Sequence, residues 1–172
     1  MKIRFATVND IPACVEGGRR MHAATRFSAY DYNAERVAQN LRAVITTGQN
    51  AHKTHCFFVA EDDGGHIIGA LIGCVERHFF SDLLVASVIH YDVLPEKRMS
   101  GAGLKLLVAF RKWAENRGVF ELSVGINSGV ELEKMDRFLK KLGFRQTGGN
   151  YALSLVNVAA REGVNQPATN RS

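Results

Sequence analysis

The chain has 172 residues and a mass of 19.0 kDa, and its 46% hydrophobic and 23% charged residues suit one globular domain rather than a disordered chain. Its net charge of +5 favours an anionic partner, either nucleic acid or a phosphorylated cofactor; the scattered basic residues, without the interleaved aromatics of an RNA-binding strand, lead us to expect no nucleic acid. No apolar run reaches the roughly 18 residues that span a bilayer, and the N-terminus lacks the apolar core of a signal peptide, so we expect a cytoplasmic protein without a membrane partner.

The first third of the chain predicts a short strand and two helices. Residues 2–6 alternate polar and apolar side chains, as a strand does. Capping side chains at residues 7–10 then begin a helix that we expect to run to about His22. An aromatic-rich connection over residues 24–33 leads to a second amphipathic helix from about Ala34.

The rest of the chain predicts more strands, interrupted by two helices. The expected elements are strands at residues 56–60, 66–75 and 85–93, a helix from Pro95 to Gly118, a buried strand at 120–126, a helix at 131–142 and two short strands around 148–149. A polar turn at residues 61–65 has the composition of a hairpin. This order predicts a mixed α/β fold with one central sheet, a single domain over residues 1–158 and a disordered tail over 159–172.

Three cysteines are an odd number, and their spacing predicts buried thiols rather than a disulfide framework. His55 and Cys56, or Cys74 and His78, contain ligand side chains, but these alternate with apolar strand positions and no Cys-x-x-Cys pair is present. We therefore expect no metal site.

The segment at residues 91–103, between a strand and a helix, carries the strongest chemical signal. Gly101 and Gly103 lack the Cβ atoms that would block close backbone approach, and N–H groups at a helix N-terminus together with Arg98 favour an anion. The Walker pattern is absent, and the dinucleotide fingerprint would need glycine at Leu106. The pattern Arg/Gln-x-x-Gly-x-Gly/Ala fits in full.

These residues resemble the GNAT superfamily of acyl-CoA N-acyltransferases. The resemblance extends from residues 3–11 to 141–144 and includes Val93-x-Pro95-Glu96-x-Arg98 and Asn127. The sequences at residues 21–22, 79–81 and 100–103 are similar to a bacterial and phage-borne branch of unknown substrate. The resemblance implies a mixed, mostly antiparallel sheet flanked by helices, with a V-shaped splay between the fourth and fifth strands.

The resemblance also implies a site for acetyl-CoA. The pantetheine arm would lie in the splay and pair with backbone near the end of the fourth strand, and the turn would hold the pyrophosphate. Asn127 matches the family asparagine that touches the pantetheine arm, although Asn127-Ser128-Gly129 equally suits a simple turn. The implied cofactor-binding residues are Val93, Leu94, Arg98, Met99, Ser100, Gly101, Ala102, Gly103 and Asn127.

A base for the amine nucleophile would come from the strand before the glycine turn, as in many family members. His90 and Asp92 lie on that strand, and Glu76 and His78 lie on the strand before it. His90 has a suitable ordinary pKa, but a histidine within an apolar strand also suits packing. The third alternative needs no base, because the amine would lose its proton directly to water.

One position departs from the family pattern. Leu139 stands where many members have a tyrosine that protonates the departing thiolate, so Tyr151 or solvent would replace it. Tyr30 and Tyr32, with Phe27, lie in the connection that borders the acceptor site in this family, although they also suit anchoring of a loop to the core.

The residues therefore support two hypotheses. The first is an N-acetyltransferase that moves an acetyl group from acetyl-CoA to a primary amine of a small molecule or peptide, with a homodimer as a candidate assembly. The second is an inactive acyl-CoA-binding or protein-interaction module of the same fold, motivated by Leu139 and the lack of an obvious base.

Overall fold

The computed structural model describes residues 1–49, 54–153 and 155, so the tail expected from residue 159 lies outside the described residues. The chain divides into two compact units, Met1–Ser128 and Gly129–Ser172, and the expectation of a single domain over 1–158 stays a prediction. The first unit contains β1 (Lys2–Phe5), η1 (Val8–Asp10), α1 (Ile11–Ala23), η2 (Arg26–Ala29), α2 (Ala34–Gln49), β2 (His55–Glu61), β3 (Ile67–Arg77), β4 (Leu84–Val93), η3 (Pro95–Ser100), α3 (Ala102–Glu115) and β5 (Glu121–Val124), where η marks a 3-10 helix. The second unit contains α4 (Leu132–Lys141).

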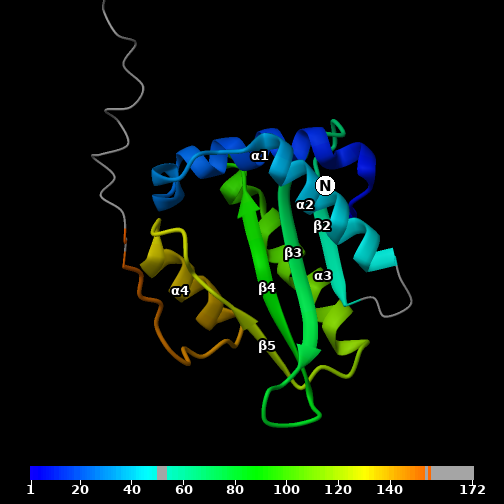
Figure 1. Cartoon of the computed structure of the whole chain (residues 1–172), viewed down its shortest axis with the longest axis vertical. Coiled ribbons are helices and arrows are strands. Elements are labelled where there is room, and N and C mark those ends of the chain that lie inside the picture. The colour runs from blue at the N-terminus through cyan, green and yellow to red at the C-terminus, as the bar shows by residue number, and fades with distance from the viewer. Residues whose placement is uncertain (50–53, 154, 156–172) are drawn as a thin grey trace, which may run out of the picture. The chain divides into compact units, whose positions relative to one another are not determined.

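The five strands form one sheet in the order β1-β2-β3-β4-β5, antiparallel except for the parallel pair β4–β5 (Figure 1). Pairing of β4 with β5 runs only from Val85↔Glu121 to Val88↔Val124, whereas β4 continues to Val93. Figure 1 shows β5 diverging from β4 beyond this point. The mixed, mostly antiparallel sheet with a splay between the fourth and fifth strands is therefore as expected.

A β-bulge marks the place where the splay begins. Ile72 of β3 pairs with His90, but the next residue, Gly73, pairs with Val88, so Ile89 is an extra residue in β4. A bulge bends its strand. Because backbone N–H and C=O groups alternate between the two edges of a strand, one extra residue shifts this alternation by one position. The free half of β4, residues 89–93, therefore presents different backbone groups from those that pair with β5.

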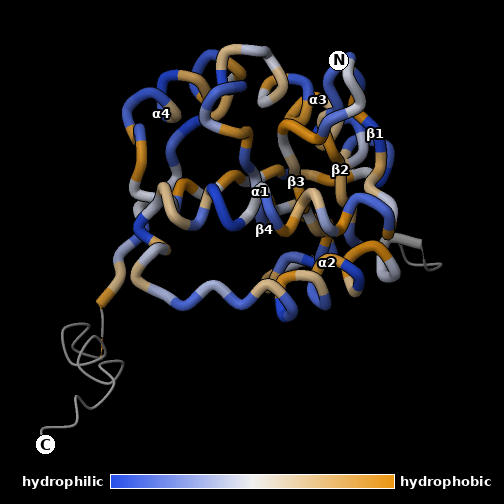
Figure 2. The backbone as a smooth tube through the Cα atoms, turned by 90° about the horizontal axis from the view of Figure 1, so that it is seen from above, coloured by the Kyte–Doolittle hydropathy of each residue, from blue (hydrophilic) through white to orange (hydrophobic). Residues whose placement is uncertain are grey.

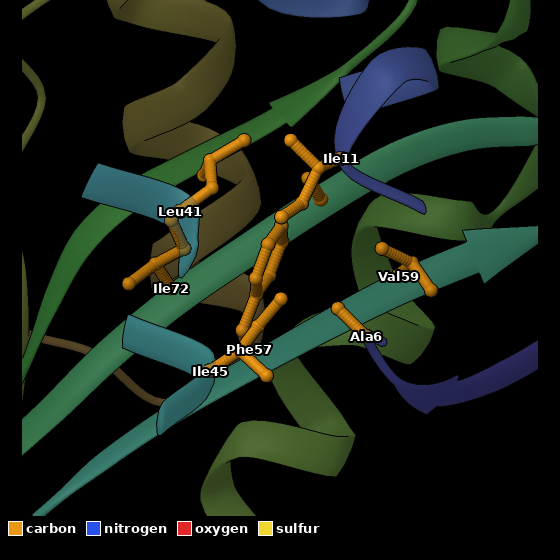
Figure 3. Close-up of a cluster of buried hydrophobic side chains, with 8 residues drawn as sticks. Ala6, Ile11, Leu41, Ile45, Phe57, Val59 and Ile72 are labelled. Atoms are coloured by element: carbon orange, nitrogen blue, oxygen red, sulfur yellow. The ribbon is translucent and has the colours of Figure 1, made fainter. Parts of the chain in front are cut away.

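Helices cover both faces of the sheet, with α2 on one side and α3 on the other (Figure 2). The α1/α2 side is packed by a cluster of buried apolar side chains, shown in Figure 3: Ala6, Ile11, Leu41, Ile45, Phe57, Val59, Ala70 and Ile72. On the other side, Leu106, Phe110 and Trp113 of α3 are buried. Phe110 packs so closely on Gly73 that any Cβ there would collide with its ring.

The entry into α1 is held by a buried carboxylate. Asp10 accepts hydrogen bonds from the Thr7 N–H at 2.7 Å and from two nitrogens of Arg4 at 2.8 Å each. The Arg4 guanidinium, with further hydrogen bonds from Thr7, lowers the pKa of Asp10 to about 2, against the opposing effect of burial. The expected capping segment is thus an ion-paired corner that joins β1 to α1.

Two expectations about the later part of the chain are wrong. The strand expected to be buried over residues 120–126 is β5, which is shorter and half exposed because it lies at the edge of the sheet. The two short strands expected around residues 148–149 are absent, because residues 143–153 contain no strand and all of 145–153 are exposed. A strand forms where it finds a backbone partner and buries a face, and this segment buries none.

In the second unit, α4 begins after Glu131, which has a φ of 50°, and carries the salt bridge Lys140–Asp136 one turn apart at 2.8 Å. Leu139 is buried and Tyr151 is fully exposed. Within the described part of the chain, no helix is both long and apolar enough to cross a membrane.

Candidate functional site

The glycine turn follows β4 directly and leads into α3. After Leu94 the chain makes the 3-10 helix Pro95–Ser100, and Gly101 then adopts a left-handed conformation with a φ of 80° before α3 begins at Ala102. A Cβ added to Gly101 would meet no atom within 4 Å, so the space beside it is open. A side chain is disfavoured at Gly101 by the backbone conformation, while a ligand has room to approach.

The start of α3 offers hydrogen-bond donors toward this space. Lys105 is the first residue whose N–H bonds back along the helix, to the Gly101 carbonyl at 3.1 Å. The Ala102 N–H donates to Ser100 Oγ at a long 3.3 Å. The N–H of Gly103 has no acceptor within the helix by geometry, and the helix dipole adds partial positive charge at the same end. This arrangement suits a phosphate or another anion.

Gly103 differs from Gly101 in its surroundings. A Cβ on Gly103 would collide with the Tyr91 hydroxyl of β4, so this glycine is required by the packing of α3 on the sheet. Burial raises the pKa of Tyr91 far above its usual range, as expected for a phenol enclosed between strand and helix. The sequence pattern assigned both glycines to ligand approach, and the structure gives Gly103 this further reason.

The free edge of β4 presents the backbone groups of Val93. The Leu94 N–H donates to the Ile68 carbonyl of β3 at 2.9 Å, so Leu94 directs its backbone toward β3. Neighbouring residues of a strand direct their N–H and C=O groups to opposite edges, which leaves those of Val93 on the side where β5 has ended. Of Val93 and Leu94, the cofactor-binding residues expected at the end of this strand, Val93 has the backbone orientation that pairing with pantetheine needs.

Successive side chains of β4 point to opposite faces of the sheet. His90 lies opposite Ile72 and Asp92 opposite Ala70, and both partners belong to the cluster beneath α1 and α2. Directly opposed residues of antiparallel strands point to the same face, so His90 and Asp92 also face α1 and α2. Tyr91, which lies between them in the strand, points to the α3 face, where its hydroxyl lies beside Gly103.

His90 and Asp92 form a pair, with His90 Nε2 3.5 Å from Asp92 Oδ2. The His90 side chain is 47% exposed and that of Asp92 only 9%, so the histidine is not packed into the core. Loss of solvation lowers the pKa of His90, but the hydrogen bond and charge of Asp92 outweigh it, and the pKa lies above its ordinary value. The pair can accept a proton and stabilise the resulting imidazolium.

The other two polar candidates lie away from this pair. Glu76 is opposite Val85, several residues along the β3–β4 ladder from the His90 position, and His78 lies in the turn beyond β3. The His78 N–H donates to the Leu83 carbonyl at 2.8 Å as part of that hairpin. Of the four polar candidates on these two strands, the structure therefore brings His90 and Asp92 together.

The aromatic connection after α1 has two kinds of tyrosine. The Tyr32 hydroxyl donates to the Val15 carbonyl at 2.6 Å, and the Arg19 guanidinium lies 5.0 Å from the centre of its ring. Tyr30 is exposed, and its ring stacks on Phe27 at 6.3 Å. Tyr32 thus anchors the connection to α1, whereas Tyr30 stays accessible.

Two glycines of α1 contribute to this region and were not singled out from the sequence. A Cβ on Gly18 would lie 3.0 Å from the Tyr32 hydroxyl, and one on Gly17 would lie 3.7 Å from the Leu94 side chain. Adjacent glycines inside a helix cost roughly 1 kcal/mol each relative to alanine, so their presence in the expected helix was an available signal of close packing.

Asn127 lies in the segment after β5, at the open end of the splay, and this segment is tied to η2. Arg26 Nε donates to the Asn127 carbonyl at 2.6 Å, and the Arg26 N–H donates to the Ser128 carbonyl at 3.1 Å. The Asn127 side chain is not used in either bond. Arg26 thus joins the connection after α1 to the far side of the splay, a link between residues 101 positions apart.

Comparisons with known proteins bear on the identity of this fold. The sequence model of the acetyltransferase (GNAT) family matches residues 21–144. A search of the curated proteins returned no match.

Several solved structures share the fold at low sequence identity. A transcriptional regulator from Bacillus halodurans C-125 is 20% identical with a TM-score of 0.70, over 90% of this chain and 99% of that chain. Glucosamine-6-phosphate N-acetyltransferase from Arabidopsis thaliana is 15% identical with a TM-score of 0.69, over 90% and 98% of the two chains. An aminoglycoside antibiotic 6'-N-acetyltransferase from Acinetobacter baumannii is 17% identical with a TM-score of 0.66, over 91% and 98%.

Proposed function

The chain belongs to the acetyltransferase (GNAT) family, and from this premise we propose that it transfers an acetyl group from acetyl-CoA to a primary amine of a small molecule or peptide. The observation that carries the proposal is the turn after β4, where Gly101 has a φ of 80° and open space beside it at the start of α3. Two structurally similar proteins are N-acetyltransferases by name, which supports nitrogen as the acceptor atom.

The turn at residues 98–103 and the free edge of β4 fit the two polar parts of acyl-CoA, which supplies an acyl group activated as a thioester. In the proposed complex, N–H groups at the start of α3 and the Arg98 side chain bind the pyrophosphate. The backbone of Val93 pairs with the amides of the pantetheine arm, and Asn127 lies across the splay from it. This geometry would direct the acyl group toward the half of β4 that carries His90.

His90 is the proposed base. The amine nitrogen forms a bond to the acyl carbon, the thioester C–S bond breaks, and His90 accepts the proton that the amine loses. Asp92, 3.5 Å from His90, holds the ring and stabilises the imidazolium. Because Asp92 raises the pKa of His90, the neutral, base-competent imidazole forms only above that raised pKa, and activity should fall as the pH drops through it.

Departure of CoA needs no dedicated acid in this proposal. Leu139 offers no hydroxyl, and a thiol pKa of about 8.5 makes the thiolate a moderately good leaving group that solvent can protonate near neutral pH. The same leucine motivates the second candidate, a module that binds acyl-CoA without turnover.

A thiol-release assay separates the two candidates. The purified protein is incubated with acetyl-CoA and a panel of primary amines, amino sugars and peptides, and free CoA thiol is followed with time. Amine-dependent thiol release above the hydrolysis background is the expected result. Tight CoA binding measured by calorimetry, with no thiol release in the presence of any amine, would contradict acetyl transfer and support the binding module.

A further inference from the structure

The 3-10 helix η3, which begins the glycine turn, is fastened from two directions by ion pairs. Arg20 Nη2 of α1 lies 2.8 Å from both carboxylate oxygens of Glu96, although the two residues are 76 positions apart. The neighbouring Lys97 Nζ lies 3.6 Å from Asp62 Oδ2 in the turn between β2 and β3. Adjacent residues of η3 are therefore held by two different parts of the fold.

The partners of Glu96 and Lys97 are themselves firmly placed. Arg20 lies on α1, the helix that Gly17 brings against the end of β4. Asp62 accepts the N–H groups of Gly64 and His66 at 3.0 Å each, which fixes its carboxylate within the hairpin turn. The two anchors thus belong to different elements outside η3, one to α1 and one to the turn between β2 and β3.

The turn needs such support because 3-10 helices have poorer hydrogen-bond geometry than α-helices and rarely persist alone. Exposed ion pairs usually add little to global stability, so their effect here would be local. The hydrogen bond from Arg20 lowers the pKa of Glu96, so the carboxylate stays charged and paired to a lower pH than an ordinary glutamate would. A local effect on η3 passes directly to Gly101 and the donors that follow it.

We infer that Arg20 and Glu96 are positioning residues, whose ion pair holds residues 98–103 in the conformation that binds the pyrophosphate of acyl-CoA. The inference rests on the proposed function, since it concerns the same turn. Neither side chain is required to touch the ligand. Arg20 acts through Glu96, and Glu96 acts through the backbone of η3.

The direction in which one substitution changes CoA affinity distinguishes a positioning role from a simple effect of charge. Glu96 is an anion a few residues from the proposed phosphate site, so by charge alone its removal should strengthen CoA binding. If the ion pair positions the turn, Glu96→Gln should instead weaken binding, because the turn loses its link to α1. The two models therefore predict opposite changes in the dissociation constant.

The experiment measures CoA affinity by calorimetry for the wild type, Glu96→Gln, Arg20→Gln, the double variant and the charge exchange Arg20→Glu/Glu96→Arg. We expect Glu96→Gln to weaken CoA about three- to fivefold, the range of a well-formed exposed pair. The double variant should bind no more weakly than the worse single variant, and the charge exchange should recover most of the loss. Glu115→Gln, which breaks the exposed pair with Arg111 at the far end of α3, is the matched control.

Amide hydrogen exchange of residues 97–103 in the ligand-free protein gives a second, independent readout. Faster exchange in Glu96→Gln than in the wild type, with no change in Glu115→Gln, would support positioning even if the wild type failed to bind CoA, a failure that would refute the proposed function alone. Tighter CoA binding by Glu96→Gln, or unchanged exchange across residues 97–103, would overturn the inference.

Discussion

At the scale of single residues, successive side chains of β4 point to opposite faces of the sheet. His90 and Asp92 face α1 and α2, while Tyr91 packs beneath the first turn of α3. Residues two positions apart in a strand point to the same face, and His90 and Asp92 do so here. The enclosure of Tyr91 by Gly103 was not predictable, because it depends on how closely a later helix approaches the strand.

Asp92→Asn should lower the pKa of His90 below its ordinary value. The hydrogen bond to the Asp92 carboxylate, together with its charge, raises this pKa, and when both are weakened the remaining loss of solvation favours the neutral ring. NMR titration of the His90 ring protons measures the change directly, and the acid limb of kcat/KM should move to lower pH in parallel. An unchanged titration midpoint would show that Asp92 does not act on His90.

At the scale of elements, sequence patterns predicted the strands and helices that bury a face and failed where packing decides. Alternation and helical spacing located β2, β3, β4 and α3, each of which contributes buried apolar side chains to the core. The expected strands around residues 148–149 were inferred from composition and buried no face. Pairings such as Arg26 with Asn127 or Arg20 with Glu96 join distant segments, and no local pattern encodes them.

The corner between β1 and α1 should make the protein's stability depend on acid pH. The pKa of Asp10 is lowered from 3.8 to about 2, so its charge stabilises the folded state above the unfolded pKa, and this contribution is lost as the pH falls through the folded pKa. The shift corresponds to about 2 kcal/mol at neutral pH.

Urea unfolding of Asp10→Asn at pH 7 should therefore show a loss of about 2 kcal/mol relative to the wild type. The difference between the two proteins should shrink between about pH 4 and pH 2. A difference that stays constant across this range would mean that Asp10 acts by shape rather than by charge.

At the scale of the whole first unit, the splay of the sheet produces the geometry of the proposed site. The bulge at Ile89 and the early end of β5 free the last residues of β4, and η3 and Gly101 lead from the end of this strand into α3. Anion donors, free backbone and the His90–Asp92 pair thus meet along one strand and its following turn. The family resemblance predicted this arrangement, whereas composition and charge alone predicted only an anionic partner.

The most direct test of this account is the CoA affinity of Gly101→Asn, with Gly118→Asn as the matched control. Both glycines have positive φ, 80° and 67°, and open space where a side chain would point, and asparagine tolerates this conformation better than most residues. Valine would strain the backbone at Gly101, and any side chain at Gly103 would meet Tyr91, so neither tests ligand binding cleanly. The account predicts that calorimetry will show CoA binding at least about tenfold weaker in Gly101→Asn, as expected for lost hydrogen bonds to a charged group, with binding unchanged in Gly118→Asn and similar Tm values for both. Equal CoA affinity in Gly101→Asn and the wild type would contradict the assignment of this turn to the pyrophosphate.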